Sequence, residues 1–271
     1  MTPHDTAACA TCVVANTAQV HKLGGRLTQW DYTVAIAGNP NTGKSTIFNT
    51  LTGLRQHTGN WSGKTVVRAE GGYRYQGAQY RLVDLPGTYS LLSTSADEEV
   101  ARDFVLFGQP DATIVVTDAT RLERNLGLVL QIIAITPRVV VAVNCMDEAE
   151  RHGMRVDTRA LARDLGVPVV PMTARSGVGF AELLSLVAQV AHGTIQPAPV
   201  AVPMQHAQLE AAVAGLVPQL AARFPALPNL RWVALRLIEG DASIMRAVAD
   251  GTLGNLTRGM VPVVPLQEAR I

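Results

Sequence analysis

The amino-acid sequence predicts an α/β fold, in which a mainly parallel sheet is flanked by helices and followed by a small all-α domain. Apolar runs of strand length alternate with helix-length segments between residues 31 and 191, which is typical of a parallel sheet covered on both faces. The first apolar run feeds a glycine-rich turn, Gly38-Asn-Pro-Asn-Thr-Gly-Lys-Ser45, that opens a helix. The proline-rich residues 193–203 then separate this part from a stretch with helical periodicity.

The elements of the first part follow from these runs in chain order. Short apolar runs predict strands at residues 31–37, 65–75, 79–84, 112–117, 138–143 and 167–170. Between them we expect helices at residues 44–52, 97–107, 121–135, 157–165 and 178–191. Residues 53–64 are punctuated by glycines and are expected to form a loop.

The second part is expected to be a helical domain. Leu209, Val213, Leu216 and Leu220 recur at helical spacing and form one apolar face. Two more helices are expected at residues 231–239 and 242–249, with Gly240 as the stop between them. The predicted organisation is therefore a poorly ordered extension at 1–30, an α/β domain at 31–192, a linker at 193–203 and a helical domain at 204–271.

Composition and charge exclude several classes of function. The chain has 271 residues, of which 48% are hydrophobic and 17% are charged, enough for one α/β core and a second small unit. Its net charge of +1 gives no electrostatic footprint for nucleic acid, so no nucleic-acid partner is expected. Its apolar runs are far shorter than the roughly 20 residues that span a bilayer, and no signal peptide opens the chain, so we expect it to be soluble.

The glycine-rich turn fits the phosphate-binding pattern GxxxxGK[ST]. In such a turn, backbone N–H groups converge on phosphate oxygens, while Lys44 reaches the terminal phosphates and the Ser45 hydroxyl is placed to hold Mg²⁺. Asp84-Leu-Pro-Gly87 follows the strand-like residues 79–83. This is where phosphate-loop enzymes place a Mg²⁺-organising aspartate and a glycine whose N–H senses the γ-phosphate. The sequence therefore predicts a site for a nucleoside triphosphate.

Two later motifs favour guanine over adenine. Asn144-Cys-Met-Asp147 follows the apolar residues 138–143, and the Asp147 carboxylate can accept hydrogen bonds from both N1–H and the 2-amino group of guanine. Adenine lacks that pair of donors, and such bidentate base contacts discriminate by about 1–3 kcal/mol. Residues 171–176 stand where a small-residue loop can offer a backbone N–H to guanine O6.

The cysteines indicate neither a disulfide framework nor a complete metal site. Cys9, Cys12 and Cys145 are few and unevenly spaced, which agrees with a reducing compartment. Cys9 and Cys12, with His4 upstream, supply at most three ligands where a structural site needs four. A frayed amino terminus is the favoured interpretation.

Several segments together resemble one family, the amino-terminal cytoplasmic part of FeoB, the bacterial ferrous iron transporter. The resemblance runs from about residue 31 to the end of the chain. The segments that carry it are Gly38-Asn-Pro-Asn-Thr-Gly-Lys-Ser45, Gly59-Asn-Trp-Ser-Gly-Lys-Thr65-Val, Asp84-Leu-Pro-Gly-Thr-Tyr-Ser-Leu91, Glu98-Glu-Val-Ala-Arg-Asp-Phe104 and Leu237-Ile-Glu-Gly-Asp241. The resemblance implies a Ras-like P-loop GTPase domain, then a helical domain, ahead of a membrane region that carries Fe²⁺ at the cytoplasmic face of the bacterial inner membrane.

The resemblance also implies roles for individual residues. Thr65 is the switch threonine that joins Ser45 and Asp84 on Mg²⁺ when GTP is present, and Gly87 reports the γ-phosphate to a second switch from Thr88 to about Asp97. Asp97 and Glu98 match an acidic pair of the family. The implied nucleotide-binding residues are Gly38, Asn39, Pro40, Asn41, Thr42, Gly43, Lys44, Ser45, Thr46, Gly63, Lys64, Thr65, Val66, Val67, Asp84, Leu85, Pro86, Gly87, Asn144, Cys145, Met146, Asp147, Thr173, Ala174 and Arg175.

The catalytic group is harder to infer. Many GTPases place a glutamine after the Asp-x-x-Gly motif, but here Thr88 and Tyr89 follow Gly87. Asn41 resembles the asparagine with which a potassium-activated subset of GTPases coordinates K⁺ against the phosphates, where the cation replaces the charge of an arginine. The expected catalytic residues are Asn41, Lys44, Thr65 and Gly87. His57 as a general base is disfavoured, because a loose phosphoryl-transfer transition state needs little proton abstraction.

Three functions stay open at this point. The chain is a GTPase that gates or drives iron passage, a slow nucleotide-dependent binding switch, or a potassium-dependent GTPase associated with the ribosome or tRNA. The expected partners are GTP or GDP and the membrane region, and a homo-oligomer stays open. The chain departs from the family in its first 30 residues and in Lys64, and Leu266–Ile271 resembles the opening of a last helix that we expect to be truncated.

Overall fold

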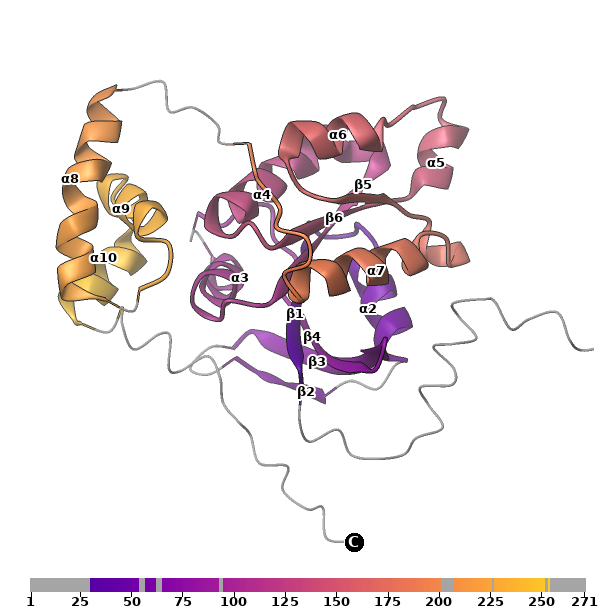
Figure 1. The fold of residues 1–271 in the computed structure, drawn as a ribbon, viewed down its shortest axis with the longest axis horizontal. Coiled ribbons are helices and arrows are strands. Elements are labelled where there is room, and N and C mark those ends of the chain that lie inside the picture. The colour runs from indigo at the N-terminus through magenta and orange to yellow at the C-terminus, as the bar shows by residue number, and fades with distance from the viewer. Residues whose placement is uncertain are drawn as a thin grey trace, which may run out of the picture. The chain divides into compact units, whose positions relative to one another are not determined.

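The computed structural model describes residues 30–53, 57–61, 65–92, 95–200, 207–225, 227–251 and 253. These residues contain a seven-stranded sheet with the order β2-β3-β4-β1-β5-β6-β7 (Figure 1). The strands are β1 (Tyr32–Gly38), β2 (His57–Asn60), β3 (Val67–Tyr75), β4 (Ala78–Asp84), β5 (Ala112–Asp118), β6 (Val139–Asn144) and β7 (Val169–Pro171). The predicted mainly parallel α/β sheet is confirmed.

The pairing of the strands explains where the carboxyl ends meet. β4, β1, β5, β6 and β7 are parallel neighbours in that order, so these five strands end at the same edge of the sheet. β3 runs antiparallel to β4 and is joined to it by the two-residue turn Gln76–Gly77. Both turn residues are left-handed, with φ of 48° and 86°, which is the geometry that matches the twist of a tight hairpin.

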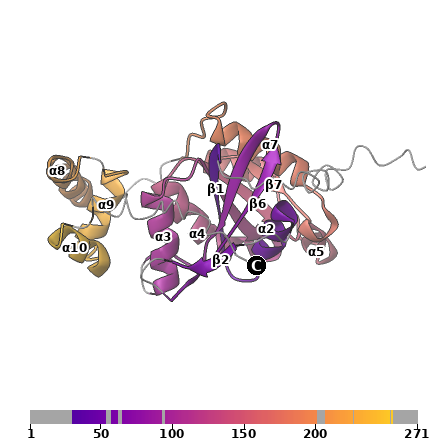
Figure 2. The same ribbon diagram turned by 90° about the horizontal axis from the view of Figure 1, so that it is seen from below.

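Helices cover both faces of the sheet, as Figure 2 shows with the strands between them. Alternate residues of the strands point to opposite faces. Val34 and Ile36 of β1 and Ile114 of β5 belong to one apolar cluster with residues of α2 and α7. α4 packs on β5 and β6, and its Leu128 and Ile132 are buried. The helices of this part are α2 (Lys44–Thr52), α3 (Ala96–Phe107), α4 (Leu122–Ile135), α5 (Met146–Arg151), α6 (Thr158–Leu165) and α7 (Phe180–Ala191).

One prediction about local structure is wrong, and one helix was not predicted. Residues 53–64 are not all loop, because residues 57–60 form β2, which pairs antiparallel with β3 at the edge of the sheet. The sequence of β2, His-Thr-Gly-Asn, carries no apolar alternation, so only its partner makes it a strand. The short helix α5 was also missed, because six residues with four charges give no apolar periodicity.

The chain divides into two compact units, one of Met1–Arg102 with Pro110–Ala201 and one of Asp103–Gln109 with Val202–Ile271. The second unit contains the end of α3, from Asp103, together with α8 (Ala207–Arg223), α9 (Leu230–Ile238) and α10 (Ala242–Ala249). Asn229 caps α9 and Asp241 caps α10 through side-chain oxygens that accept from backbone N–H groups. Arg231 donates to both carboxylate oxygens of Glu210, at 2.9 and 2.7 Å, and so ties α9 to α8.

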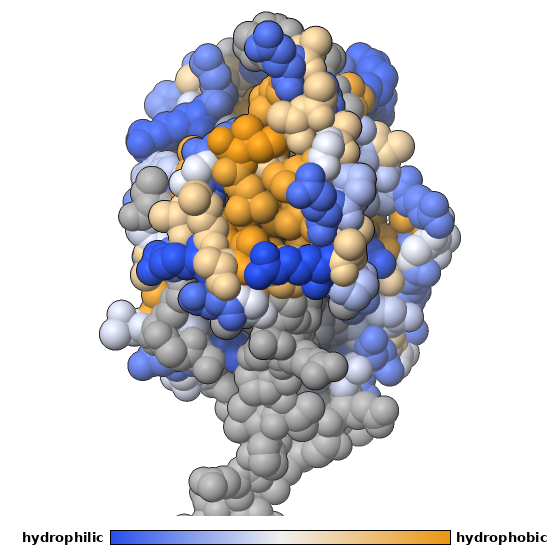
Figure 3. Space-filling model, turned by 90° about the vertical axis from the view of Figure 1, so that its left-hand side faces the viewer, coloured by the Kyte–Doolittle hydropathy of each residue, from blue (hydrophilic) through white to orange (hydrophobic). Residues whose placement is uncertain are grey.

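Apolar side chains are also exposed on the helical unit. Figure 3 shows an apolar patch bordered by hydrophilic residues. The large apolar side chains exposed on α9 and α10 are Ile238 and Met245. Among the described helices, none is both long enough and apolar enough to cross a bilayer. Cys9, Cys12 and His4 lie outside the described residues, as does the segment Leu266–Ile271.

A pair of leucines on α4 tests the packing of the sheet. Leu128→Ala should destabilise the protein by about 2–5 kcal/mol, because a side chain that is 1% exposed would leave a cavity. Leu130→Ala removes the same atoms from a side chain that is 41% exposed on the same helix, and it should lower the stability by less than about 1 kcal/mol. Chemical denaturation followed by circular dichroism measures both changes, and equal losses would contradict the burial of this face.

Candidate functional site

The phosphate loop lies between the end of β1 and the start of α2. Gly38 is buried in close contact with β5, since an added Cβ would lie 2.6 Å from the carbonyl oxygen of Val116. Gly43, directly before α2, has φ of 85°, and Asn41 has φ of 65°. Inside the loop, the Thr42 hydroxyl donates to the carbonyl of Asn39 at 2.9 Å. The loop therefore has a left-handed turn geometry that most side chains disfavour. It also places the amino terminus of α2 at the edge of the sheet.

Parallel pairing of β1 and β4 brings Asp84 to this loop. Ile36 is the register partner of Asp84, and the Lys44 ammonium group pairs with the Asp84 carboxylate. Burial raises the pKa of Asp84, while the charge and hydrogen bond of Lys44 oppose that rise. Gly87 also lies against the loop, since an added Cβ would stand 3.5 Å from Pro40. The Asp-x-x-Gly segment and the phosphate loop are thus brought together as the sequence predicted from strand ends.

Asn144 joins the phosphate loop to the last loop of the site. Its side chain is buried, and its Nδ2 donates to the carbonyl of Thr42 at 3.0 Å. Its Oδ1 accepts from the backbone N–H of Ala174 at 2.9 Å. An added Cβ on Gly43 would stand 2.2 Å from the same Nδ2, so this contact requires glycine there. One amide therefore connects segments that are 102 and 30 residues away from it in sequence.

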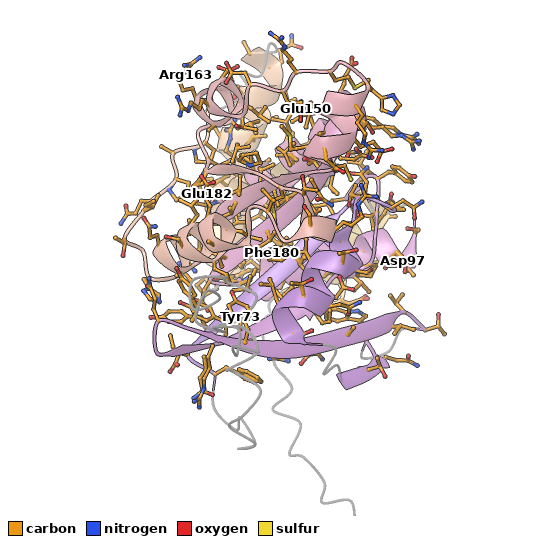
Figure 4. The ribbon with its side chains drawn as sticks, turned by 90° about the vertical axis from the view of Figure 1, so that its right-hand side faces the viewer. Tyr73, Asp97, Glu150, Arg163, Phe180 and Glu182 are labelled. Atoms are coloured by element: carbon orange, nitrogen blue, oxygen red, sulfur yellow. The ribbon has the colours of Figure 1, made fainter. Side chains whose placement is uncertain are left out.

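Asp147 lies in the first turn of α5, beside the loop that contains Thr173, Ala174 and Arg175. In Figure 4, Glu150 marks α5, the helix that carries Asp147, and Phe180 marks the start of α7, which follows this loop in the chain. Arg175 donates to Oδ2 of Asp147 at 2.6 Å, and Arg151 donates to the same oxygen at 3.3 Å. Partial desolvation acts to raise the pKa of Asp147, but the hydrogen bond and charge of Arg175, helped by Arg151, outweigh it and hold that pKa below its usual value.

The other predicted residues are placed as follows. Cys145 precedes α5 with φ of 62°, and burial raises the pKa of its thiol, as do the nearby carboxylates. Thr65 is exposed, and the carbonyl of Val66 accepts from the backbone N–H of Trp61 at 2.9 Å. Ser45 and Thr46 are exposed at the start of α2, and Val67, at the start of β3, is 64% exposed. Gly63 and Lys64 lie outside the described residues, and His57 is the first residue of β2.

Sequence reasoning missed a second group of polar residues beside the phosphate loop. A cavity of about 20 Å³ borders Asn39 and Asn41 and reaches Asp118, Arg124 and Asn125. The guanidinium of Arg124 lies 4.7 Å from the centre of the Tyr89 ring, and Asn125 accepts from the backbone N–H of Asp118 at 2.7 Å. Asp118 is the last residue of β5, a buried parallel strand. A polar residue at the end of an apolar strand is the sequence pattern that also identified Asp84 and Asn144.

The donor set suits a hard divalent cation bound together with phosphates. A hydroxyl on Ser45 and a carboxylate on Asp84 are the oxygen ligands that Mg²⁺ prefers, and Mg²⁺ usually takes one or two protein ligands and completes its shell with water and phosphate oxygens. In the part of the chain that the structure describes, no three His, Cys, Asp or Glu side chains cluster as a metal site formed by protein alone. The chemistry of the residues therefore fits a cation that arrives with its nucleotide.

Comparison with known proteins gives a consistent result. Residues 32–187 match the family model described as ferrous iron transport protein B. The Fe(2+) transporter FeoB of Salmonella choleraesuis (strain SC-B67) is 41% identical over 229 residues, which is 83% of this chain and 29% of that protein. The chain thus spans less than a third of the length of such relatives.

Solved structures agree with this similarity. The cytosolic domain of the T. maritima FeoB iron transporter in GDP form II is 34% identical with a TM-score of 0.72, covering 88% of this chain and 89% of that one. The cytosolic domain of L. pneumophila FeoB is 32% identical with a TM-score of 0.69, covering 84% of this chain and 96% of that one.

Two left-handed glycines provide a test of the Asn144 contact. Gly43→Ala should weaken binding of GDP more than tenfold, because the new methyl group would displace the Asn144 amide. Gly77→Ala changes a glycine of nearly the same φ, 86° against 85°, where nothing lies within 4 Å of the added Cβ, and it should leave GDP affinity unchanged. Titration with fluorescently labelled GDP measures both, and equal effects of the two variants would contradict the role of this contact.

Proposed function

The chain belongs to the FeoB family, and on this premise we propose that it binds guanine nucleotides and hydrolyses GTP. The observation that carries the proposal is the Asn144 amide, with its hydrogen bonds of 3.0 Å to Thr42 and 2.9 Å from Ala174. These bonds hold the phosphate loop close to the loop of residues 173–175, called the base loop below, at one edge of the sheet. A single nucleotide then spans from Lys44 to Asp147, with guanine selected by the Asp147 carboxylate.

The pairing of Lys44 with Asp84 supports a role for both in phosphate binding. Asp84 is half-buried, and its partner is the lysine of the phosphate loop. Phosphate oxygens compete for Lys44 more strongly than a single carboxylate, because they carry more charge and the α2 amino terminus also faces them. Lys44 then turns to the β- and γ-phosphates, and Asp84 and Ser45 are free to hold Mg²⁺ with Thr65. When bound, Mg²⁺ neutralises charge on the β- and γ-phosphates.

Asn41 supports the further proposal that K⁺ stimulates hydrolysis. No glutamine follows Gly87; Thr88 is 5% exposed and the Tyr89 ring lies against Arg124. Asn41 is exposed in a left-handed conformation in the middle of the phosphate loop, where its side-chain oxygen is available to a cation. A monovalent cation held there adds positive charge where negative charge develops, as an arginine does in other GTPases.

We also propose that the GTP cycle regulates or drives ferrous iron uptake at the cytoplasmic face of the bacterial inner membrane. The proposed role in iron uptake rests on the similarity to Fe(2+) transporters, which are more than three times as long as the matched segment. A potassium-dependent ribosomal or tRNA-associated GTPase is not favoured, because the family match points to a transporter. A slow binding switch differs from an active GTPase only in its rates, so kinetics must separate the two.

Hydrolysis assays with matched cations test the proposal. We expect GTP but not ATP to be hydrolysed with Mg²⁺, at a rate roughly tenfold or more higher in K⁺ than in Na⁺ or Li⁺, which corresponds to ~1.4 kcal/mol of transition-state stabilisation. Asn41→Gly should abolish the preference for K⁺ while keeping GDP binding, because glycine retains the left-handed backbone. Equal rates in the three cations would refute the potassium site, and turnover slower than GDP release by orders of magnitude would favour the binding switch.

A further inference from the structure

The side chain of Arg175 holds the carboxylate that is expected to recognise the base. Its Nη2 donates to Oδ2 of Asp147 at 2.6 Å. The Arg175 side chain is 74% exposed and the Asp147 side chain is 35% exposed. Arg151, one turn along α5, reaches the same oxygen at 3.3 Å. The shorter bond makes Arg175 the main partner of Asp147 in this structure.

The chemistry of the two possible partners of Asp147 is alike. Guanine presents N1–H and an amino hydrogen side by side, attached to one carbon. The guanidinium of arginine likewise presents paired N–H donors from one planar carbon, and both groups match a carboxylate. Arginine differs in its positive charge, which adds an electrostatic attraction to the carboxylate.

The two partners exclude each other at Oδ2. A carboxylate oxygen offers two lone-pair positions, and Oδ2 already accepts from two arginines. Guanine needs both carboxylate oxygens in one plane for its two donors. A short bond from Arg175 therefore has to break, or lengthen, before the base is fully bound.

The backbone around Arg175 keeps the arginine close whether or not the base is present. Residues Ala174–Ser176 form a short 3-10 turn, and the N–H of Thr173 donates to the carbonyl of Val178 at 3.1 Å. Ala174 is fixed to Asn144 by its N–H. Only the exposed side chain of Arg175 needs to move, so exchange between arginine and base requires no rearrangement of the loop.

We propose that Arg175 is a tethered competitor of guanine: its guanidinium occupies the Asp147 carboxylate in the empty site, leaves when the base binds, and thereby lowers the affinity for guanine nucleotides. This inference rests on the proposed function of the site. The competition acts on the base and not on the phosphates, so it weakens GDP and GTP by the same factor. The same arginine keeps the empty carboxylate paired and ionised.

Removal of the arginine tests the competition. Arg175→Ala should bind labelled GDP about two- to fivefold more tightly at low salt, because an exposed ion pair of this kind contributes little. The gain in GDP affinity should be smaller at high salt, because salt already screens the Arg175–Asp147 ion pair in the wild-type protein. Arg159→Ala, which removes one charge from an exposed arginine of α6, is the control and should leave GDP affinity unchanged. Weaker or unchanged GDP binding by Arg175→Ala at low salt would overturn the inference.

A change of base shows whether the effect passes through Asp147. Xanthine carries a carbonyl oxygen in place of the 2-amino group, so Asp147→Asn should bind xanthosine diphosphate in preference to GDP. In that variant the ion pair is lost, and adding Arg175→Ala should leave xanthosine diphosphate affinity unchanged. If Arg175→Ala changed the xanthosine diphosphate affinity of the Asp147→Asn variant as much as it changes the GDP affinity of the wild-type protein, Arg175 would act at a place other than Asp147. No GDP binding by the unchanged protein would refute the proposed function itself, whereas normal binding with no effect of Arg175→Ala refutes only the competition.

Discussion

The hydrogen bonds of one buried amide, that of Asn144, hold the site together. Its Nδ2 and Oδ1 join the phosphate loop to the base loop, which come from opposite ends of the α/β unit. A buried amide that loses one partner is destabilising, so each loop fixes the position of the other. The contact also explains Gly43, since a Cβ at this position would take the place of the amide nitrogen. The distance between the two loops is therefore set by the Asn144 contacts and the packing of the sheet.

Part of the phosphate loop is buried, although Asn41, Ser45 and Thr46 are exposed. Asn39 and Thr42 are 2% exposed, the loop closes on itself through Thr42, and the amino terminus of α2 supplies N–H groups and a favourable dipole for an anion. Lys44 and Asp84 form an ion pair and neutralise each other. Burial of the Asp84 carboxylate is unfavourable unless a cation stays beside it, which Lys44 provides first and a metal ion provides in the proposed nucleotide complex.

The base side has the opposite character. Asp147 lies on a six-residue helix, its arginine partners are exposed, and their bonds to it are ion pairs at the surface. Such pairs are weak and salt-dependent, so the base side is suited to exchange while the phosphate side is suited to tight positioning. Asn144 binds both loops, but the phosphate loop also lies against β5 at Gly38, whereas the Arg175 side chain of the base loop is 74% exposed.

Much of this arrangement was determined by the sequence alone. Apolar runs followed by Gly38, Asp84 and Asn144 indicated parallel strands whose polar ends meet, because the carboxyl ends of parallel strands share one edge. The edge strand β2 and the helix α5 were decided only by tertiary contacts, since neither has apolar periodicity of its own. The same holds for the Arg124–Tyr89 stack and for Arg175 on Asp147. Local patterns specify which backbone elements form, whereas side chains distant in sequence find their partners only when the packed sheet fixes their distance and direction.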